Sequence, residues 1–226
     1  MSETRLITAA GEFELHRYPA RRRELLRAWD AADEYLLHEL SEMDSHDGHT
    51  LVVNDGFGSL AVALSHLSPV SWSDSWLAHE ALHENLKRNA CEDAGVRTLR
   101  STQNPAESPD LLLLKVPKSL ALLEDQLIRL KPMLNAGARF IVAGMVKTMP
   151  SSLWDMLERI IGPTRTSLAR KKARLIEVSV ASSLPLPESP YPCRWTLEGT
   201  TLEIVNHANV FSRERLDIGT RFLLQN

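Results

Sequence analysis

Residues 50–60 have the sequence TLVVNDGFGSL, and this stretch decides the fold. Its first four residues, Thr50–Val53, are aliphatic or β-branched, which predicts a short buried strand. The following Asp55-Gly56-Phe57-Gly58 predicts a tight turn, and Ser59 begins a helical pattern. A buried strand that passes through a glycine turn into a helix opens a βαβ unit, so the stretch predicts a parallel sheet.

The chain on both sides of this stretch continues the alternation. Strands are expected at residues 70–73, 96–99, 111–116, 138–145 and 164–181, and helices at 21–43, 59–65, 75–93, 119–134 and 151–161, the last one capped by Ser151 or Ser152. Strands that alternate with helices predict an α/β class protein with a doubly wound, mainly parallel, Rossmann-like sheet.

The same pattern predicts four regions. Residues 1–48 are expected to form an N-terminal helical extension, and residues 49–181 the Rossmann-like domain. Four prolines in residues 182–194 indicate a linker. Residues 195–226 are expected to form a β-hairpin tail followed by the start of an apolar helix. Because that helical pattern stops after about two turns, it favours a fragment of a longer protein.

Composition is typical of a globular protein, with 43% hydrophobic and 24% charged residues. The uncharged aliphatic run at 111–114 is far shorter than the roughly 20 residues of a membrane span, and the N-terminus has no apolar core typical of a signal peptide. Cys91 and Cys193 give no disulfide framework. We therefore expect a cytoplasmic protein with no membrane partner.

Charge is distributed unevenly along the chain. The first 113 residues carry 10 Lys and Arg against 19 Asp and Glu, whereas the remaining 113 carry 16 against 10. No acid lies between Glu158 and Glu177, but Arg159, Arg165, Arg170, Lys171, Lys172 and Arg174 do. This segment is either an anion-binding patch or a strand face with solvated basic side chains.

The glycine turn is a candidate nucleotide site. Gly56 and Gly58 would let the backbone approach a ligand at the helix N-terminus, and Asp74, at the end of the next strand, would hold ribose hydroxyls. However, Leu60 stands where a third glycine would be expected, and Phe57 is bulky where a cofactor would lie. The alternative is a loop that keeps its tight turn without binding anything.

Two further motifs carry candidate chemistry. Lys115 and Lys118 end the strand at 111–116, where methylation of an amine would need an acceptor; protonated lysines cannot accept, so they contact phosphate or are merely solvated. His79 and His83 form an H-E-x-x-H sequence, which in metalloproteases binds zinc. Here the helix belongs to a βαβ unit, so we expect Leu77, Ala81 and Leu82 to face the sheet and both histidines to face solvent.

Six segments carry a family resemblance: 26–37, 52–58, 115–124, 168–176, 206–213 and 216–222. With these segments the chain resembles, over essentially its whole length, the N-terminal half of the bacterial ribosomal RNA large subunit methyltransferase G family. The related small-subunit methyltransferase C shares the layout and the tail, and is the near alternative.

The resemblance implies a duplicated class I methyltransferase fold. In the family the second half carries the S-adenosylmethionine loop and the Asn-Pro-Pro-Phe motif, and methylates the N2 amine of a guanine in ribosomal RNA. The first half is a degenerate copy, so no residue of this chain is expected to be catalytic. The resemblance implies that Phe211, Asp217, Gly219 and Thr220 lead into the catalytic half, where they either line its cofactor pocket or serve only in packing.

The resemblance also implies a binding partner for the basic segment, namely ribosomal RNA. Under this hypothesis seven residues hold ribosomal RNA phosphates: Lys115, Lys118, Arg165, Arg170, Lys171, Lys172 and Arg174. A sheet of this kind would also help to position the catalytic domain of the same protein. The alternative function is a structural pseudo-domain that supports the catalytic half without contacting RNA.

Overall fold

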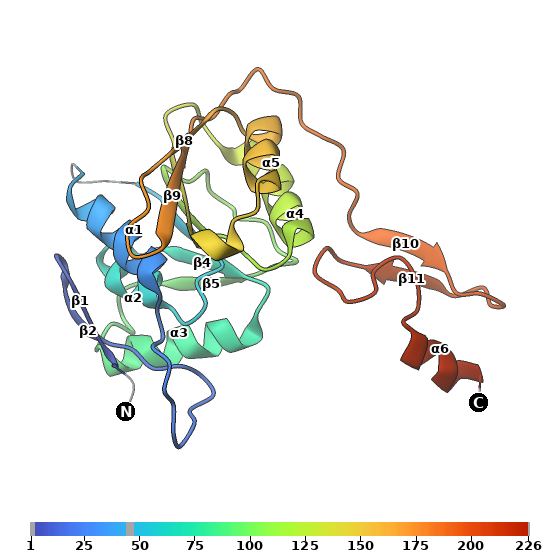
Figure 1. The fold of residues 1–226 in the computed structure, drawn as a ribbon, viewed down its shortest axis with the longest axis horizontal. Helices are drawn as coiled ribbons and strands as arrows, with labels where there is room; N and C mark the ends of the chain where they lie inside the picture. Colours follow the sequence, from blue (N-terminus) through green and yellow to red (C-terminus); the bar gives the residue numbers. More distant parts are fainter. Residues whose placement is uncertain (1–2, 44–47, 226) are drawn as a thin grey trace.

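A computed structural model describes residues 3–43 and 48–225 (Figure 1). Its centre is a seven-stranded sheet with the order β5-β4-β3-β6-β7-β9-β8. The strands are β3 (Thr50–Val53), β4 (Val70–Ser73), β5 (Arg97–Arg100), β6 (Leu111–Lys115), β7 (Arg139–Met145), β8 (Thr164–Thr166) and β9 (Ala173–Val178). Only the pairs that involve β9 are antiparallel, which confirms the predicted doubly wound, mainly parallel sheet.

Helices cover both faces of the sheet. One face packs against α1 (Ala31–Ser41), α2 (Ser59–Ala63) and α3 (Trp76–Arg88), and the other against α4 (Leu120–Leu130) and α5 (Ser152–Ile160). Alternate strand residues serve the two cores: Val52 lies in the first, whereas Leu51 and Val53 lie in the second. This period-2 alternation between two apolar layers explains why the strands are continuously hydrophobic. Short 3-10 turns follow α2, α4 and β7: they are η1 (Ser65–Leu67), η2 (Lys131–Met133) and η3 (Val146–Thr148).

Two hairpins lie outside the central sheet. The first pairs β1 (Arg5–Thr8) with β2 (Gly11–Glu14), and the second pairs β10 (Cys193–Thr196) with β11 (Glu203–Asn206). The second hairpin and α6 (Ile218–Gln225) stand away from the body of the molecule, joined to it by an extended segment (Figure 1). Among the described residues, no helix is both long and apolar enough to cross a membrane.

Three predicted elements differ from the structure. The helix expected at 21–43 begins only at Ala31, because Asp30 caps it by accepting from the backbone N–H groups of Ala32 and Asp33. The strand expected at 164–181 is two strands, β8 and β9, joined by a turn. Ser151 has helical backbone angles and makes no capping hydrogen bond, so the predicted serine cap of α5 is wrong for that residue.

Candidate functional site

The glycine turn after β3 is closed by its own aspartate. The buried Asp55 carboxylate turns back to α2 and accepts from the N–H groups of Leu60 (2.9 Å) and Ala61 (3.0 Å) and from the Ser59 hydroxyl (3.3 Å). Burial raises the pKa of Asp55 against the effect of these hydrogen bonds. A ligand at this helix N-terminus would need the N–H groups that Asp55 already binds.

Gly58 fixes the path of the same turn. Its φ is +81°, and a Cβ atom there would lie 2.8 Å from the Leu82 Cα of α3. The turn is also held from outside: Asn85 donates to the Phe57 carbonyl at 2.9 Å, and the Arg17 guanidinium lies 4.6 Å from the Phe57 ring centre. The glycine therefore serves close packing between two helices, and the N-terminal segment lies over the loop.

Lys115, the last residue of β6, is not at the surface. Only 12% of its side chain is exposed, and its ammonium lies 2.8 Å from Asp30 Oδ1 and 2.6 Å from Asp33 Oδ1. Burial opposes the ammonium charge, but the Asp33 and Asp30 carboxylates outweigh it and raise the Lys115 pKa. The expectation that Lys115 contacts phosphate or is solvated is therefore wrong, because both carboxylates already occupy its ammonium.

The two aspartates respond differently to this pairing. Burial raises the pKa of Asp33 to about 6, although the Lys115 ammonium acts in the opposite direction. The pKa of Asp30 is lowered, because Lys115 outweighs its partial burial. Asp30 and Asp33 were missed by sequence analysis, yet their spacing before a helix is that of a capping box, which could have located them.

A second polar cluster joins β3 and β6 to α4. Asn54 and Gln126 exchange two side-chain hydrogen bonds of 2.9 Å, and Asn54 also donates to the Lys115 carbonyl at 3.2 Å. Gln126 is fully buried, so these hydrogen bonds satisfy amide groups whose burial without a partner would destabilise the fold. The carboxyl ends of the two central strands are thus linked to each other by the chain itself.

Asp74, the predicted ribose ligand at the end of β4, binds the tail instead. Its Oδ2 accepts from Asn209 Nδ2 at 2.5 Å. The turn that carries Asn209 is internally braced: Arg213 donates to the Ala208 carbonyl at 2.7 Å, and its guanidinium stacks on Tyr191 at 5.2 Å. Ala208 is buried, and Figure 1 shows this turn reaching toward the body of the molecule.

The H-E-x-x-H sequence lies on α3 and shows no metal site. Ala81 and Leu82 are buried and His83 is exposed, as predicted. Leu77, however, is half exposed and His79 is buried, so the prediction is wrong for these two residues. Burial lowers the pKa of His79, which favours its neutral form. Within residues 3–43 and 48–225 no group of three or more His, Cys, Asp or Glu side chains could hold a metal ion.

The basic segment forms the turn between β8 and β9, at the carboxyl edge of the parallel strands. Arg170 and Ala173 exchange backbone hydrogen bonds of 2.9 and 2.8 Å, which leaves Lys171 and Lys172 as the two central turn residues. Both have positive φ, 49° and 64°. Such turns strongly favour Asn-Gly, so two consecutive lysines here keep a strained backbone and expose two ammonium groups.

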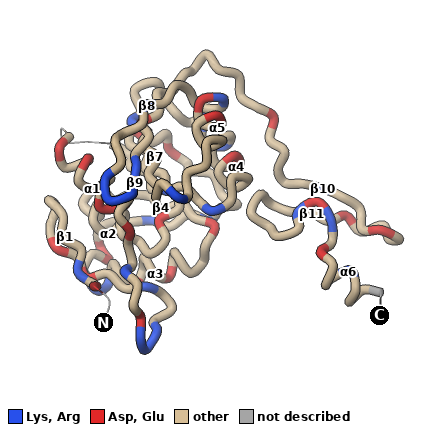
Figure 2. Tube along the Cα trace, viewed as in Figure 1, with Lys and Arg blue, Asp and Glu red and all other residues tan. Residues whose placement is uncertain are grey.

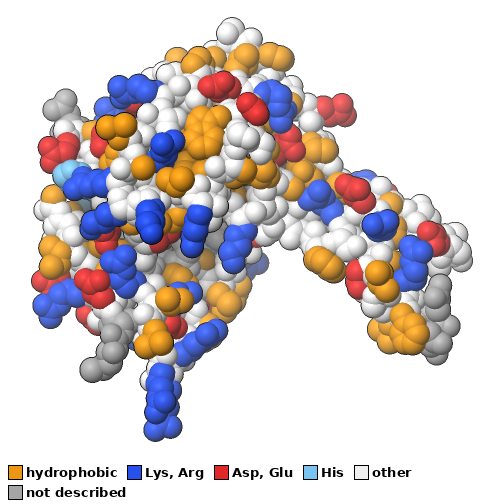
Figure 3. All heavy atoms as spheres, in the orientation of Figure 1, with side chains coloured by type: hydrophobic (Ala, Val, Ile, Leu, Met, Phe, Trp, Pro, Cys, Tyr) orange, Lys and Arg blue, Asp and Glu red, His pale blue; other side chains and the backbone are white. Residues whose placement is uncertain are grey.

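The residues predicted to bind phosphate differ in their exposure and in whether a carboxylate of the protein already pairs with them. Lys118, Arg170 and Lys172 are exposed and make no ion pair with the rest of the described chain. Lys171 is exposed but pairs with Glu34 at 2.8 Å, and Arg165 pairs with Glu177 at 2.6 Å. Arg174 is half buried, and its Nε has no hydrogen-bond partner in the described structure. Figures 2 and 3 show Lys and Arg gathered across this face.

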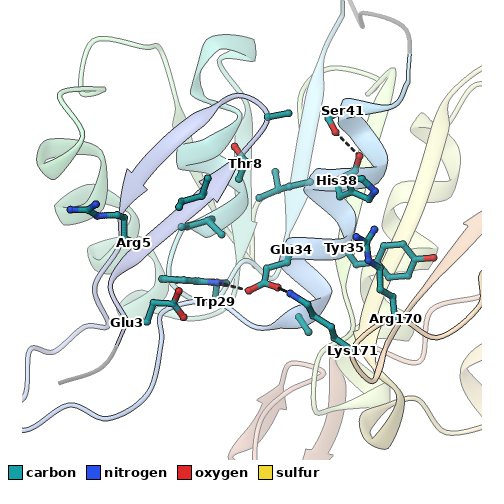
Figure 4. Close-up of a pocket in the computed structure, with 15 residues that line it drawn as sticks. Glu3, Arg5, Thr8, Trp29, Glu34, Tyr35, His38, Ser41, Arg170 and Lys171 are labelled. Carbon is teal, nitrogen blue, oxygen red and sulfur yellow. Dashed lines mark hydrogen bonds and ion pairs between the residues drawn. The ribbon is translucent and has the colours of Figure 1, made fainter.

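A cavity of about 370 Å³ adjoins the turn. Its walls come from the β1–β2 hairpin, α1 and the turn, and include Trp29, Tyr35 and His38 (Figure 4). Arg170 lies over the Tyr35 ring at 5.9 Å, while Glu34 accepts from Trp29 Nε1 at 3.1 Å and binds Lys171. The turn is therefore attached to α1 by aromatic and ionic contacts.

The four residues that the resemblance assigns to a cofactor pocket lie in the tail. Asp217 accepts from the backbone N–H groups of Gly219 and Thr220 and from the Thr220 hydroxyl, which lowers its pKa and caps α6. Phe211 is 84% exposed in the turn before α6. Three of the four residues are thus brought together at one helix start, away from the sheet.

Strand order, the glycine turn and helices on both faces define a Rossmann-like fold of the methyltransferase type. Among solved structures, the T. thermophilus 16S rRNA N2 G1207 methyltransferase, determined with AdoMet and guanosine, matches with a TM-score of 0.64 at 17% identity, over 98% of this chain and 57% of that one. A ribosomal protein L11 methylase from Lactobacillus delbrueckii matches with a TM-score of 0.53 at 16% identity, over 74% of this chain and 90% of that one.

The chain belongs to the RLMG N-terminal domain family, whose model matches residues 3–182. Curated relatives named ribosomal RNA large subunit methyltransferase G include one from Streptomyces griseus, 48% identical over 98% of this chain and 60% of its own length. Another, from Aeromonas hydrophila, is 44% identical over 99% of this chain and 60% of its own length. The chain thus spans about 60% of the length of these relatives.

Removal of the buried ammonium tests the Lys115 cluster. Lys115→Met leaves Asp30 and Asp33 facing each other without a cation, so the free energy of unfolding at about pH 7.5 should fall by about 3–5 kcal/mol. The pKa of Asp33 is raised to about 6 in the folded protein. The stability that its protonation contributes is therefore complete below the pKa of the unfolded chain and is lost as pH rises through the folded-state pKa. Without the cation that pKa rises further, so the loss should be smaller at about pH 5.

The measurement is urea unfolding at both pH values. Lys118→Met is the matched control, because Lys118 is exposed and outside the cluster, and it should change stability by less than about 0.5 kcal/mol at either pH. A loss in Lys115→Met that is the same at both pH values would contradict the charge assignment.

The contact between Asp74 and Asn209 predicts how the tail is held. Asn209→Asp places two carboxylates at hydrogen-bond distance, so the turn at 207–213 should open more often. Exchange of the Val210 N–H, which donates to the His207 carbonyl, should accelerate on the order of tenfold for a loss of about 1.4 kcal/mol. Asp74→Asn keeps an acceptor oxygen and should exchange more nearly as the unaltered chain does; identical exchange in Asn209→Asp would refute the contact.

Proposed function

We propose that this chain is the non-catalytic, RNA-contacting N-terminal half of an S-adenosylmethionine-dependent 23S rRNA (guanine-N2)-methyltransferase. It binds ribosomal RNA on the β8–β9 turn and supports the catalytic domain of the same protein in the cytoplasm. The single observation that carries the RNA contact is the pair of consecutive lysines with positive φ at the tip of that turn.

The lysine pair supports RNA binding because its backbone conformation is energetically unfavourable. An L-residue in the left-handed region loses about 1–2 kcal/mol relative to glycine, and this turn keeps two such residues in succession. A turn selected only for hairpin stability would carry Asn-Gly. Strain kept at an exposed cationic tip is typical of a site whose side chains are needed for a ligand, here a polyanion.

The non-catalytic role is supported by the carboxyl edge of the sheet. The residues there do not fit S-adenosylmethionine, because Asp55 occupies the start of α2, Asp74 binds Asn209, and Lys115 holds two carboxylates. In the proposed full-length enzyme the cofactor and the guanine amine are bound by the part beyond this chain, and Phe211, Asp217, Gly219 and Thr220 adjoin that part.

Replacement of the two lysines separates the structural from the functional role. Lys171→Asn with Lys172→Gly relieves the backbone strain, so the free energy of unfolding should rise by about 1 kcal/mol. Binding of a fluorescent RNA hairpin with an unpaired loop should weaken, and the slope of log affinity against log salt should decrease by about 1–2. The measurements are urea unfolding and fluorescence anisotropy.

Arg194→Ala is the control for that experiment. Arg194 is an exposed cation on the tail hairpin that pairs with Glu203, so its loss should leave RNA affinity unchanged. Unaltered affinity in the double lysine variant would contradict the proposed RNA contact and favour a structural pseudo-domain.

Cofactor binding is tested by calorimetry of this chain with S-adenosylmethionine. We expect no binding in the sub-millimolar range, because the polar groups of the edge are already paired within the chain. Sub-millimolar binding that is lost in Asp74→Ala would instead assign Asp55, Gly56, Gly58 and Asp74 to a working cofactor site.

A further inference from the structure

A second cationic feature lies on the loop between β2 and α1. Arg21, Arg22 and Arg23 are consecutive and exposed, and none of them makes an ion pair within the described chain. Figure 2 shows this loop projecting from the body of the molecule with its tip occupied by basic residues. The triplet stands in the half of the sequence that is otherwise rich in acids.

Both ends of the loop are anchored. On one side Arg17 lies over the Phe57 ring at 4.6 Å. On the other side Arg27 binds Glu34 at 2.8 Å, and its guanidinium lies 5.2 Å from the Trp29 ring centre. The flanking arginines thus fix the loop. Of the three arginines between them, Arg21 lies near enough to the Glu24 carboxylate to help lower its pKa, and none makes a close ion pair with another described residue.

The tip contains one acid, and it is used within the loop. Glu24 accepts from the backbone N–H groups of Leu25 (3.0 Å) and Leu26 (2.9 Å), which turns the chain back toward the body. Leu25 and Leu26 are 77% and 61% exposed. The tip therefore combines three unpaired guanidinium groups with apolar surface, which suits phosphates together with the sugar and base edges of a folded RNA.

The loop belongs to the same side of the molecule as the β8–β9 turn. Figure 3 shows the basic side chains of the face in a band, and those of the loop below them on the same visible surface. Arg17 touches Phe57, which follows β3, so the loop starts at the carboxyl edge of the sheet, where Lys118 also lies. Both features therefore face the same visible side of the molecule.

We infer that the loop at residues 17–27 is a second RNA-binding element, in which Arg21, Arg22 and Arg23 contact phosphates of the RNA held by the β8–β9 turn. This inference rests on the proposed function. Two separated contacts on one RNA raise its affinity more than either contact alone, since the second contact forms within an existing complex.

The test is a pair of matched double variants in this chain. Arg22→Ala with Arg23→Ala should weaken binding of the fluorescent RNA hairpin on the order of tenfold at low salt and reduce the salt slope by about 1–2. Arg88→Ala with Arg139→Ala is the control: both residues are exposed and outside ion pairs of the described chain, and they lie at the end of α3 and the start of β7. Thermal unfolding should be unchanged in both.

The outcomes separate this inference from the proposed function. A weakening in the loop variant with an unchanged control supports the inference. If Lys171→Asn with Lys172→Gly weakens binding and the loop variant does not, the inference fails and the proposed function stands. If neither variant weakens binding, both fail. An equal loss in the loop variant and the control would show only a response to net charge, and would overturn the loop assignment.

Discussion

A buried lysine ammonium is costly unless partners compensate its charge, and in this fold two carboxylates do so for Lys115. Because Lys115 ends β6, Asp30 and Asp33 must lie at the carboxyl edge of the sheet. The same two aspartates form the capping box that starts α1, so the start of this helix lies at the edge, with Ala28 and Trp29 buried beside it. From there α1 runs along β7 and β9, so one ionic cluster sets the helix that covers this face.

Adjacent residues of α1 then connect the closed edge to the exposed turn. Asp33 points inward to Lys115, whereas Glu34 binds Lys171 of the β8–β9 turn and accepts from Trp29 Nε1. The buried pair holds its charges against desolvation, while the surface pair contributes little to stability and mainly directs a side chain. Helix α1 thus holds Lys115 in the interior and Lys171 at the surface.

The sequence predicts the sheet well and the chemistry of its edge poorly, for physical reasons. Buried strands such as Leu111–Lys115 carry a strong apolar signal, but no local pattern tells whether Lys115 meets solvent or two carboxylates from residues 82 and 85 positions away. The helix predicted at 21–43 starts ten residues later, at Ala31, because Asp30 caps it. The β8–β9 turn was missed because Lys171 and Lys172 replace the residues that usually mark such turns.

A polar contact joins the tail to the carboxyl edge of the sheet. In nucleotide-binding α/β folds, an acid at the end of the second strand points at the crevice above the sheet. Asp74 keeps that position and its charge, but its partner is Asn209, on a turn braced by Arg213 and Tyr191. Asp74 is exposed, so this hydrogen bond positions the tail and does not compensate a buried charge. The Asp74 carboxylate therefore links the turn at 207–213 to the carboxyl edge of the sheet.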